Sequence, residues 1–135
     1  MADTFTLEIV TPHRKLLSRE VEEVTAPGQE GEFGVLAGHS PFLTILKAGE
    51  ISYKKGSETG ALAISRGYAE VFPDKTTILV DSAQIDSEIN AEAARQELSK
   101  AEETLKGLDP ESAEYKTAQN AIEYAEAKIR VKERR

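Results

Sequence analysis

Hydrophobic and polar residues alternate along the first part of the chain, in short runs separated by glycine and proline. In residues 4–10 the alternation places Phe5, Leu7 and Ile9 on one face, which is the two-residue period of a half-buried strand. The run stops at Pro12, which lacks the amide hydrogen that a strand ladder needs. The same pattern predicts further strands at residues 15–18, 20–26, 33–36, 42–46, 51–55, 61–66, 68–72 and 76–80.

Strands this short and this closely spaced leave no room for the crossover helices of a parallel sheet. We therefore predict an antiparallel β-sandwich made of two small sheets that close on each other. Lys54 to Ser57 marks a hairpin turn, and we expect the strands at 61–66 and 68–72 to pair around Gly67.

The period of the pattern changes near residue 86 from that of strands to that of helices. Either Ser87 or Asn90 can cap the start of a first helix, because both side chains accept a hydrogen bond from a free backbone amide. We expect Gly107 to end this helix as a left-handed C-cap. The apolar positions of the helix recur at Ala94, Leu98, Ala101, Leu105 and Leu108.

A second helix is predicted to follow at once, with Asp109 as its cap and Pro110 in its first turn. Its apolar stripe comprises Tyr115, Ala118, Ile122, Ala125 and Ile129. Two such stripes joined by a short turn indicate an antiparallel α-helical hairpin. Because alanine buries little area, the hairpin is predicted to be weakly held and free to relocate. The chain thus divides into a β-sandwich domain, residues 1–86, and a helical hairpin, residues 87–135.

Composition supports this division, because eight of nine glycines, four of five prolines and all four phenylalanines precede residue 86. The absence of cysteine excludes a disulfide framework, a thiolate metal site and a cysteine nucleophile. A net charge of −7, without a basic patch in the body of the chain, argues against a nucleic-acid partner. No window approaches the roughly 18 apolar residues of a spanning helix, so we expect membrane association only through a partner.

No arrangement of residues indicates catalysis. His13 and His39 are too far apart for a convincing metal cluster, and Ser40 is adjacent to His39 and cannot face it productively. We therefore predict no catalytic residue and no metal site, and a chain that is not an enzyme by itself. On the residues alone, a β-sandwich and coiled-coil adaptor of some assembly remains open.

Residues 26–50 hold five glycines and two prolines among short apolar runs, which indicates a rigid surface built from turns. From Gly31 to Gly49 the sequence reads G-E-F-G-V-L-x-G-H-S-P-F-L-T-x-L-x-x-G, which resembles the signature of the epsilon subunit of rotary ATP synthases, called delta in mitochondria. The likeness covers the whole chain in length and layout. It implies a non-catalytic central-stalk subunit that couples gamma to the c ring of a proton-translocating ATP synthase and inhibits ATP hydrolysis through a movable hairpin.

The resemblance also implies roles for two turns that would otherwise be read as solvated or structural. It places the contact with the ring of c subunits at Glu30, Gly31, Glu32 and Phe33. It places the contact with the gamma subunit at His39, Ser40 and Pro41.

The C-terminal tail is basic. Residues 128–135 carry five cations and one carboxylate, a net charge of +4, whereas the rest of the chain carries −11. Cations stabilise a helix C-terminus by about 0.3–1 kcal/mol, but five exceed that need. The resemblance implies that the extended hairpin carries them to acidic segments of the catalytic beta subunits, where complementary charge steers docking. The predicted inhibitory residues are Lys128, Arg130, Lys132, Arg134 and Arg135.

Residues 89–94 occupy the place of a nucleotide-contact motif of the family, Ile/Leu-Asp-x-x-Arg-Ala. Here Asn90 replaces the aspartate and Ala93 replaces the arginine, so the cation that a triphosphate requires is missing. Nucleotide contact would rest on Ile89, Asn90 and Ala94. We expect an ordinary capped helix start, weak or no ATP binding, and no cofactor.

The expected partners are the gamma subunit, the c ring and the alpha/beta catalytic hexamer. The N-terminus shows no signal peptide, and the lack of a transit peptide favours the bacterial type. We therefore expect a peripheral protein at the cytoplasmic face of the bacterial plasma membrane, soluble when isolated.

Overall fold

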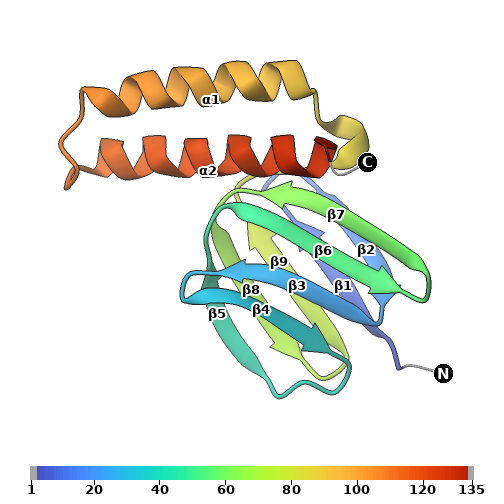
Figure 1. Ribbon diagram of the computed structural model, residues 1–135. Helices are drawn as coiled ribbons and strands as arrows, with labels where there is room; N and C mark the ends of the chain where they lie inside the picture. Colours follow the sequence, from blue (N-terminus) through green and yellow to red (C-terminus); the bar gives the residue numbers. More distant parts are fainter. Residues whose placement is uncertain (1–2, 134–135) are drawn as a thin grey trace.

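The computed structural model describes residues 3–133, which form ten strands, one short 3₁₀ helix and two α-helices (Figure 1). The strands are β1 (Phe5–Val10), β2 (Lys15–Val21), β3 (Glu23–Gly28), β4 (Gly31–Leu36), β5 (Phe42–Leu46), β6 (Gly49–Lys55), β7 (Glu58–Ile64), β8 (Gly67–Phe72), β9 (Lys75–Val80) and β10 (Ala83–Ile85). The helices are η1 (Asp86–Glu88), α1 (Ala91–Lys106) and α2 (Ala113–Glu133).

The predicted β-sandwich is confirmed, and its two faces belong to one continuous hydrogen-bonded sheet. The strand order is β10-β7-β6-β3-β5-β8-β9-β1-β2, with β4 paired to β3 outside this path. The sheet curls over so that its inward side chains enclose a single core, which includes the predicted face of β1. The largest fully buried side chains are Phe5, Leu7, Ile9, Leu46, Ile51, Leu62, Ile64 and Ile78.

One strand pair departs from the antiparallel prediction, because β1 and β9 run parallel. A crossover helix is needed only when two parallel strands are consecutive in the chain, and here seven strands lie between them. Glu8 on β1 bridges the strands on either side, with its carboxylate 2.9 Å from Lys75 Nζ and 3.1 Å from Lys15 Nζ. The hydrogen bonds from Lys75 and then Lys15 lower the pKa of Glu8, so the carboxylate links three strands.

Two strand predictions are wrong. Residues 61–66 and 68–72 do not pair, since β7 pairs with β6 and β10 whereas β8 pairs with β5 and β9. Gly67 instead marks a close passage beside β9, where a Cβ would lie 2.0 Å from the Leu79 carbonyl oxygen. The single strand expected at 20–26 is broken at Glu22, so that β2 pairs with β1 while β3 pairs with β4 and β6. The turn at Lys54 to Ser57 is confirmed as the β6–β7 hairpin, and Gly56 there has a φ of 62°.

The predicted start of α1 is confirmed, and its predicted end is wrong in detail. Asn90 Oδ1 accepts a hydrogen bond of 2.9 Å from the Ala93 amide. Gly107 has a φ of −95°, outside the left-handed region, and its amide bonds the Thr104 carbonyl at 3.3 Å. The helix therefore ends in a tightened turn that any residue could adopt.

The second helix begins later than predicted. Ser112 Oγ caps it by accepting from the Tyr115 amide at 3.1 Å, while Asp109 Oδ1 accepts from the Glu111 amide at 3.0 Å. Asp109, Pro110 and Glu111 thus form a turn before the helix. A serine two residues after a proline offers the same cap chemistry as aspartate, and the sequence pattern could not separate the two.

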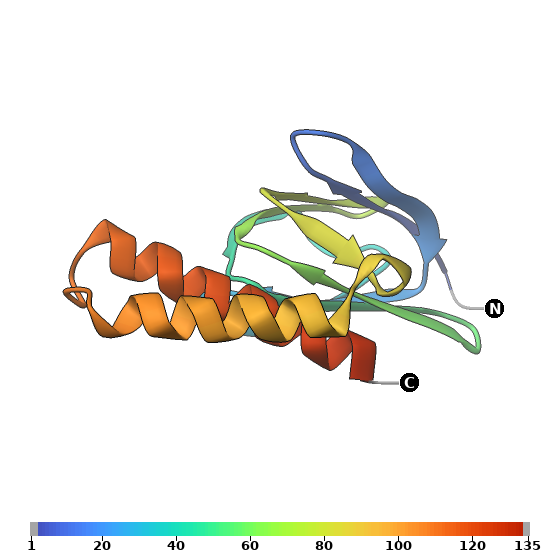
Figure 2. The ribbon, with the colours of Figure 1, turned by 90° about the horizontal axis from the view of Figure 1, so that it is seen from above.

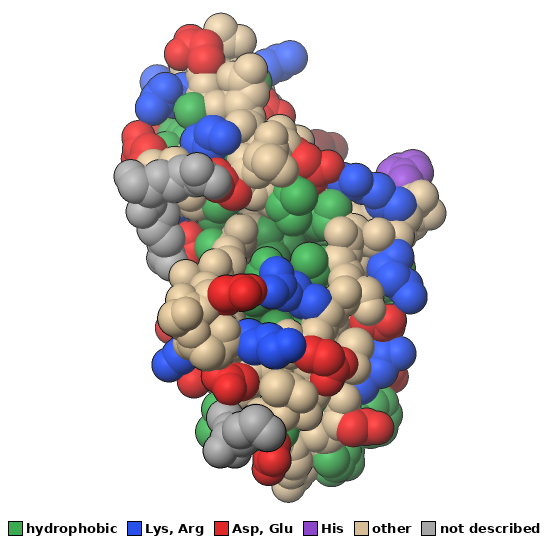
Figure 3. Space-filling view, turned by 90° about the vertical axis from the view of Figure 1, so that its right-hand side faces the viewer, with side chains coloured by type: hydrophobic (Ala, Val, Ile, Leu, Met, Phe, Trp, Pro, Cys, Tyr) green, Lys and Arg blue, Asp and Glu red, His purple; other side chains and the backbone are tan. Residues whose placement is uncertain are grey.

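The hairpin lies across one end of the sandwich, and its α1–α2 turn projects beyond it (Figures 1 and 2). The apolar contact between the hairpin and the sandwich is a small cluster in which Ala63 of β7 packs with Ala127 and Val131 of α2. Ile89, from the segment before α1, completes the cluster. A groove of about 850 Å³, lined in part by Leu17, Ile85 and Val131, stays open beside it. Figure 3 shows hydrophobic side chains in the depression between the hairpin above and the sandwich below. So small a buried cluster provides a weak attachment.

Candidate interaction surfaces

The β4–β5 loop, which carries the predicted gamma contact, is held in one shape. Gly38 has a φ of 82°, which favours glycine, and its amide donates to a carbonyl of the β8–β9 turn at 2.7 Å. His39 Nδ1 lies 2.8 Å from the Ser40 carbonyl oxygen, and the His39 ring lies 5.0 Å from that of Phe42. His39 is half-buried, whereas Ser40 and Pro41 are exposed. The loop therefore presents a rigid polar tip where the chain enters β5.

An exposed row of apolar side chains crosses four strands on the outer face of the sandwich. Ile45 of β5 lies opposite Tyr68 of β8, Tyr68 lies opposite Leu79 of β9, and Leu79 is in register with Val10 of β1. The first three have 51%, 53% and 43% of their surface exposed. We call these four residues the apolar row. Large side chains exposed side by side indicate an interaction surface.

The apolar row was not among the surfaces expected from the sequence. A signal was present in β5, where Phe42, Leu43, Ile45 and Leu46 make both faces of the strand apolar. A strand that covers a core on one side needs apolar residues on one face only. Leu43, 67% exposed, extends the apolar area along β5 beside the row.

The predicted contact with the c ring lies at the β3–β4 hairpin. Gly28 pairs with Gly31, so that Gln29 and Glu30 form the turn, and Gly31 has a φ of 136°. Glu30 and Glu32 are exposed. The turn is thus a narrow acidic projection with a backbone geometry that glycine permits.

Phe33, the fourth residue of that predicted contact, points inward rather than away from the turn. Its ring packs against the core and meets the Phe42 ring edge to face, with centroids 5.5 Å apart. Phe33 therefore supports the turn from beneath, and the exposed charge of the turn belongs to the two glutamates.

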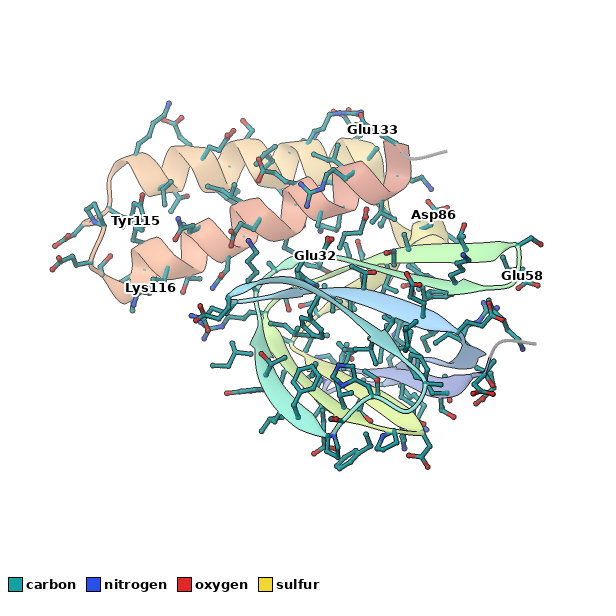
Figure 4. The ribbon with its side chains drawn as sticks, turned by 60° about the horizontal axis from the view of Figure 1, so that its bottom comes forward. Glu32, Glu58, Asp86, Tyr115, Lys116 and Glu133 are labelled. Carbon is teal, nitrogen blue, oxygen red and sulfur yellow. The ribbon has the colours of Figure 1, made fainter. Side chains whose placement is uncertain are left out.

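Glu32 also faces the hairpin. Together with residues of α2 it lines a hollow of about 450 Å³ between the sandwich and the helix, which we call the β4–α2 hollow. Figure 4 shows Glu32 on the edge of the sandwich nearest α2. The charged residues that line the hollow are Glu32, Lys47, Glu50, Glu123, Glu126 and Arg130.

Lys128, a predicted inhibitory residue, is buried between the two helices. Its ammonium lies 2.7 Å from Glu97 Oε1 of α1 and 4.5 Å from the centre of the Tyr124 ring. Only 7% of the Lys128 side chain is exposed. The same enclosure raises the pKa of Tyr124 to about 12, through burial first and then through the charges of Glu97 and Glu88.

Among the other predicted inhibitory residues, Lys132 is bound to the segment between the domains. Its Nζ donates to the Asp86 carbonyl oxygen at 3.1 Å and lies 3.7 Å from Asp86 Oδ1. Arg130 is exposed and lines the β4–α2 hollow. Arg134 and Arg135 lie outside the described residues. In this conformation two of the three described cations are therefore engaged within the chain.

The residues at the place of the nucleotide motif present no group to a phosphate. Ile89 and Ala94 are buried, and the Asn90 side chain is occupied as the cap of α1. Arg95, on the next position of the helix, pairs with Glu133 at 3.2 Å. This geometry fits a structural helix start.

Across residues 3–133, no set of three or more His, Cys, Asp and Glu side chains is placed to hold a metal ion. No helix within the same residues is long and apolar enough to cross a membrane.

A turn-built sandwich with an exposed apolar row, an acidic turn and a loosely docked helical hairpin defines a class of protein that acts by binding. The model of the beta-sandwich domain of the ATP synthase delta/epsilon chain matches residues 4–86, and that of its long alpha-helix domain matches residues 87–133. This chain belongs to the ATP synthase delta/epsilon family.

Similar proteins agree with this assignment. The ATP synthase epsilon chains of Geobacter metallireducens and Geotalea daltonii are 50% and 48% identical, over 97% of this chain and 95% of each relative. A chain of the Euglena gracilis mitochondrial ATP synthase is 26% identical with a TM-score of 0.76, over 92% of this chain and 78% of that one. A chain of the Tetrahymena thermophila central stalk and c ring, 18% identical with a TM-score of 0.62 over 98% and 96%, shares the fold.

Proposed function

We propose that this protein is a non-catalytic central-stalk subunit of a proton-translocating ATP synthase, where it couples the gamma subunit to the c ring. Relatives named ATP synthase epsilon chain align over 95% of their own length, which supports its place in that enzyme. Catalysis belongs to the complex, and this chain contributes binding. The bacterial relatives support a position at the cytoplasmic face of the plasma membrane, held there through the complex.

The apolar row is the observation that carries the proposed contact with gamma. Burying apolar surface favours association by about 25 cal/mol per Å². The β4–β5 loop leads into β5, on which Leu43 and Ile45 belong to this apolar surface, so His39, Ser40 and Pro41 would form a polar margin at the start of that strand. A hydrophobic centre with a polar rim is the usual anatomy of a stable protein interface.

The gamma contact is tested by substitutions on the apolar row. Ile45→Ser and Tyr68→Ser should each weaken binding of the purified chain to the gamma subunit at least tenfold, measured by calorimetry, because each removes a large apolar contact. Lys55→Ser on the β6–β7 turn is the matched surface control and should leave the affinity unchanged. Undiminished affinity in both row variants would rule out this surface.

The acidic β3–β4 turn is the proposed contact with the c ring, through Glu30, Gly31, Glu32 and Phe33. Exposed glutamates on a narrow turn suit a basic or hydrogen-bond-donating loop of a partner. The inward ring of Phe33 fixes the shape of the turn, and Gly31 permits it.

The hairpin, residues 87–135, is the proposed regulatory part, and residues 1–86 form the rotor-binding part. In the docked hairpin Lys132 is bound to Asp86, and Lys128 is bound to Glu97 of the facing helix. When the hairpin leaves the sandwich and its two helices separate, Lys128 and Lys132 are released. The basic residues Lys128, Arg130, Lys132, Arg134 and Arg135 then bind acidic segments of the beta subunits and oppose ATP hydrolysis.

This role predicts that replacing all five basic residues with alanine, or deleting residues 87–135, raises ATP hydrolysis by the assembled complex. Co-purification of alpha, beta and gamma subunits with both variants shows that assembly is intact. Unchanged hydrolysis in an intact complex would exclude the regulatory role, and failure to recover any of these subunits with the wild-type chain would favour an adaptor of a different assembly.

ATP is not proposed as a ligand of this chain. The buried Ile89 and Ala94 and the capping Asn90 offer a triphosphate no cation. Isothermal titration of ATP into the isolated chain should show no saturation at micromolar concentration. Clear saturation in that range would overturn this reading.

A further inference from the structure

The short helix η1 forms a bridge between the sandwich and the last turn of α2. On one side, Glu88 pairs with Arg14 of the β1–β2 loop. On the other side, Lys132 of α2 places its Nζ 3.1 Å from the Asp86 carbonyl oxygen and 3.7 Å from Asp86 Oδ1. Figure 4 shows Asp86 between the sandwich and the C-terminal end of α2. Two cations from different domains therefore bind the same three-residue connector.

The sandwich side of this bridge is held in a defined geometry. One carboxylate oxygen of Glu88 accepts from Arg14, and the other accepts from the Ile85 amide at 3.2 Å. The Thr11 amide donates to the Arg14 carbonyl oxygen at 2.9 Å, and Thr11 Oγ1 accepts from the Arg14 amide at 3.3 Å. The loop backbone is thus closed on itself, and it presents the guanidinium of Arg14 to a carboxylate that also fixes the start of η1. Hydrogen bonds between charged groups are the stronger kind.

We infer that Arg14 is a positioning residue for the docked hairpin: by fixing η1 to the sandwich, it holds Asp86 where Lys132 can reach it. Without the Arg14–Glu88 pair, η1 has more conformations to lose when the hairpin docks, and this ordering costs free energy. Loss of the pair therefore weakens docking, and it also reduces what Lys132 contributes to docking.

The place of the β1–β2 loop gives this link a consequence for regulation. Val10, of the apolar row, pairs with Lys15, the residue that follows Arg14. The loop therefore borders the surface proposed to bind gamma, and η1 connects the loop to the hairpin. The consequence for regulation rests on the proposed function, whereas the link between Arg14 and Lys132 is a property of this chain alone.

A buried thiol measures docking in the isolated full-length chain. The sequence contains no cysteine, and Ala63 is fully buried against α2, so the thiol of Ala63→Cys should react with a maleimide only while the hairpin is undocked. Its labelling rate is then proportional to the undocking equilibrium constant. The thiol of Val71→Cys, in the core of the sandwich, reports global unfolding and should react more slowly. Equal rates would mean that the hairpin does not undock separately, which would overturn the inference.

Two substitutions and their combination in the Ala63→Cys chain form a double-mutant cycle. Arg14→Gln and Lys132→Met should each raise the labelling rate by about two- to tenfold. When Arg14→Gln is already present, Lys132→Met should add less than about half of its single effect in free energy, because the two residues act through one connector. Arg14→Lys, which keeps the charge, should label more slowly than Arg14→Gln. No response to Arg14→Gln, or single effects that multiply fully in the double variant, would overturn the inference.

Arg66→Gln and Lys116→Met are the matched controls. Each removes an exposed cation that forms no ion pair with any of residues 3–133, and Lys116 lies on the same helix as Lys132. Both controls should leave the labelling rate within about a factor of two, with and without Arg14→Gln. A rise in either control as large as that in Arg14→Gln would assign the effect to net charge and would also overturn the inference.

ATP hydrolysis by the assembled complex separates this link from the proposed function. Looser docking favours the extended hairpin, so Arg14→Gln should lower hydrolysis, whereas Arg66→Gln should leave it unchanged. If labelling shows the coupling and hydrolysis does not change, the link stands and the regulatory role fails. If labelling does not respond to Arg14→Gln, the link fails whatever the hydrolysis rate is.

Discussion

At the scale of single residues, Thr76 is a polar side chain buried in the apolar core. It is 1% exposed on β9, and its Oγ1 is buried with no hydrogen-bond partner among residues 3–133. A buried hydroxyl without a partner costs roughly 1–3 kcal/mol of desolvation. Neighbouring Thr77 is half-exposed on the opposite face of the strand.

Thr76→Val should raise the free energy of unfolding by about 1 kcal/mol, because it replaces the unpaired hydroxyl with a methyl group of similar size. Thr77→Val, the same change on the other face of β9, should shift it by less than about 0.5 kcal/mol. Denaturant titration of both variants measures the difference. A loss of stability in Thr76→Val would mean that the hydroxyl has a role that the core contacts do not show.

Glycines provide a second contrast between positions. Gly107→Ala should be neutral or stabilise the protein by up to about 1 kcal/mol, because its φ of −95° suits alanine and the new Cβ would meet no crowding atom from the described part of the chain. Gly56→Ala should destabilise the protein by about 1 kcal/mol, because alanine does not readily adopt the φ of 62° found at this position. Thermal unfolding distinguishes them. Equal losses would contradict the assigned helix ending.

Which residues could be read from the sequence depended on whether their signal is local. The cap Asn90 and the buried face Phe5, Leu7 and Ile9 were predicted, since spacing and side-chain chemistry determine both. The burial of Lys128 was not predicted, because it depends on Glu97, thirty-one residues away on the facing helix. Composition marks a lysine as basic but does not tell which carboxylate encloses it.

At the scale of elements, two polar contacts tie the segment between the domains to its neighbours. Arg14, in the β1–β2 loop, pairs with Glu88 of η1, and Lys132 of α2 reaches Asp86. Glu97 joins α1 to α2 through Lys128. The first two contacts and the small apolar cluster attach the hairpin to the sandwich, whereas the Glu97–Lys128 pair holds the two helices of the hairpin together.

Glu97→Gln should loosen the α1–α2 seam by about 1–2 kcal/mol, because Lys128 keeps its buried charge and loses the carboxylate that balances it. Faster hydrogen exchange across α2 is the readout. Glu103→Gln breaks the fully exposed Glu103–Lys106 pair of α1 and should change exchange little. Exchange that is equally slow in both variants would show that Lys128 does not depend on Glu97.

The Arg14–Glu88 pair predicts a dependence on pH. The hydrogen bond from Arg14 is the main cause that lowers the pKa of Glu88 in the folded chain. The pair therefore contributes stability above the ordinary glutamate pKa of about 4.3, and this contribution is lost as the pH falls through the lower folded value.

The stability difference between wild type and Arg14→Gln should accordingly be constant from pH 7 to about pH 5 and vanish as Glu88 is protonated. Urea unfolding from pH 7 to well below the ordinary glutamate pKa of about 4.3 measures this difference. Arg66→Gln, which removes an exposed arginine with no ion pair among residues 3–133, should show no such dependence. A difference that persists when Glu88 is neutral would assign the effect of Arg14 to packing.

The strand pairings show where element prediction reached its limit. The periodicity of apolar residues located nearly every strand and the helical hairpin, because the pattern that marks the inward face of a strand lies within that strand's own sequence. Periodicity did not reveal that β1 pairs with β9, or that β7 pairs with β6 and β10 and not with β8. These pairings depend on how the whole sheet closes, and a window of about a dozen residues holds no information on contacts between distant strands.

At the scale of the whole molecule, the sandwich and the hairpin differ in how they are held. The sandwich has a continuous core of large aliphatic side chains, whereas the hairpin meets it through alanines and one valine and overhangs it at the far end. We therefore expect the hairpin to leave the sandwich well before the sandwich unfolds.

Ala127→Asp should undock the hairpin and leave the sandwich folded, because an unpaired buried charge costs several kcal/mol and Ala127 is fully buried on Ala63. Hydrogen exchange should accelerate in α2 and not in β8. Ala121→Asp, on the exposed side of the same helix, is the control. Concerted acceleration in both parts would show that they form one cooperative unit.

The parallel pairing of β1 with β9 also bears on how the protein forms during translation. The first strand to leave the ribosome has only β2 beside it until residues 75–80 follow, so the sheet stays open along that seam while most of the domain is already made. Because closure must wait for a contact between distant parts of the chain, it is a late and slow step of folding. A nascent chain halted before residue 75 should therefore bind chaperones, and one extended past residue 80 with enough linker to clear the exit tunnel should be released.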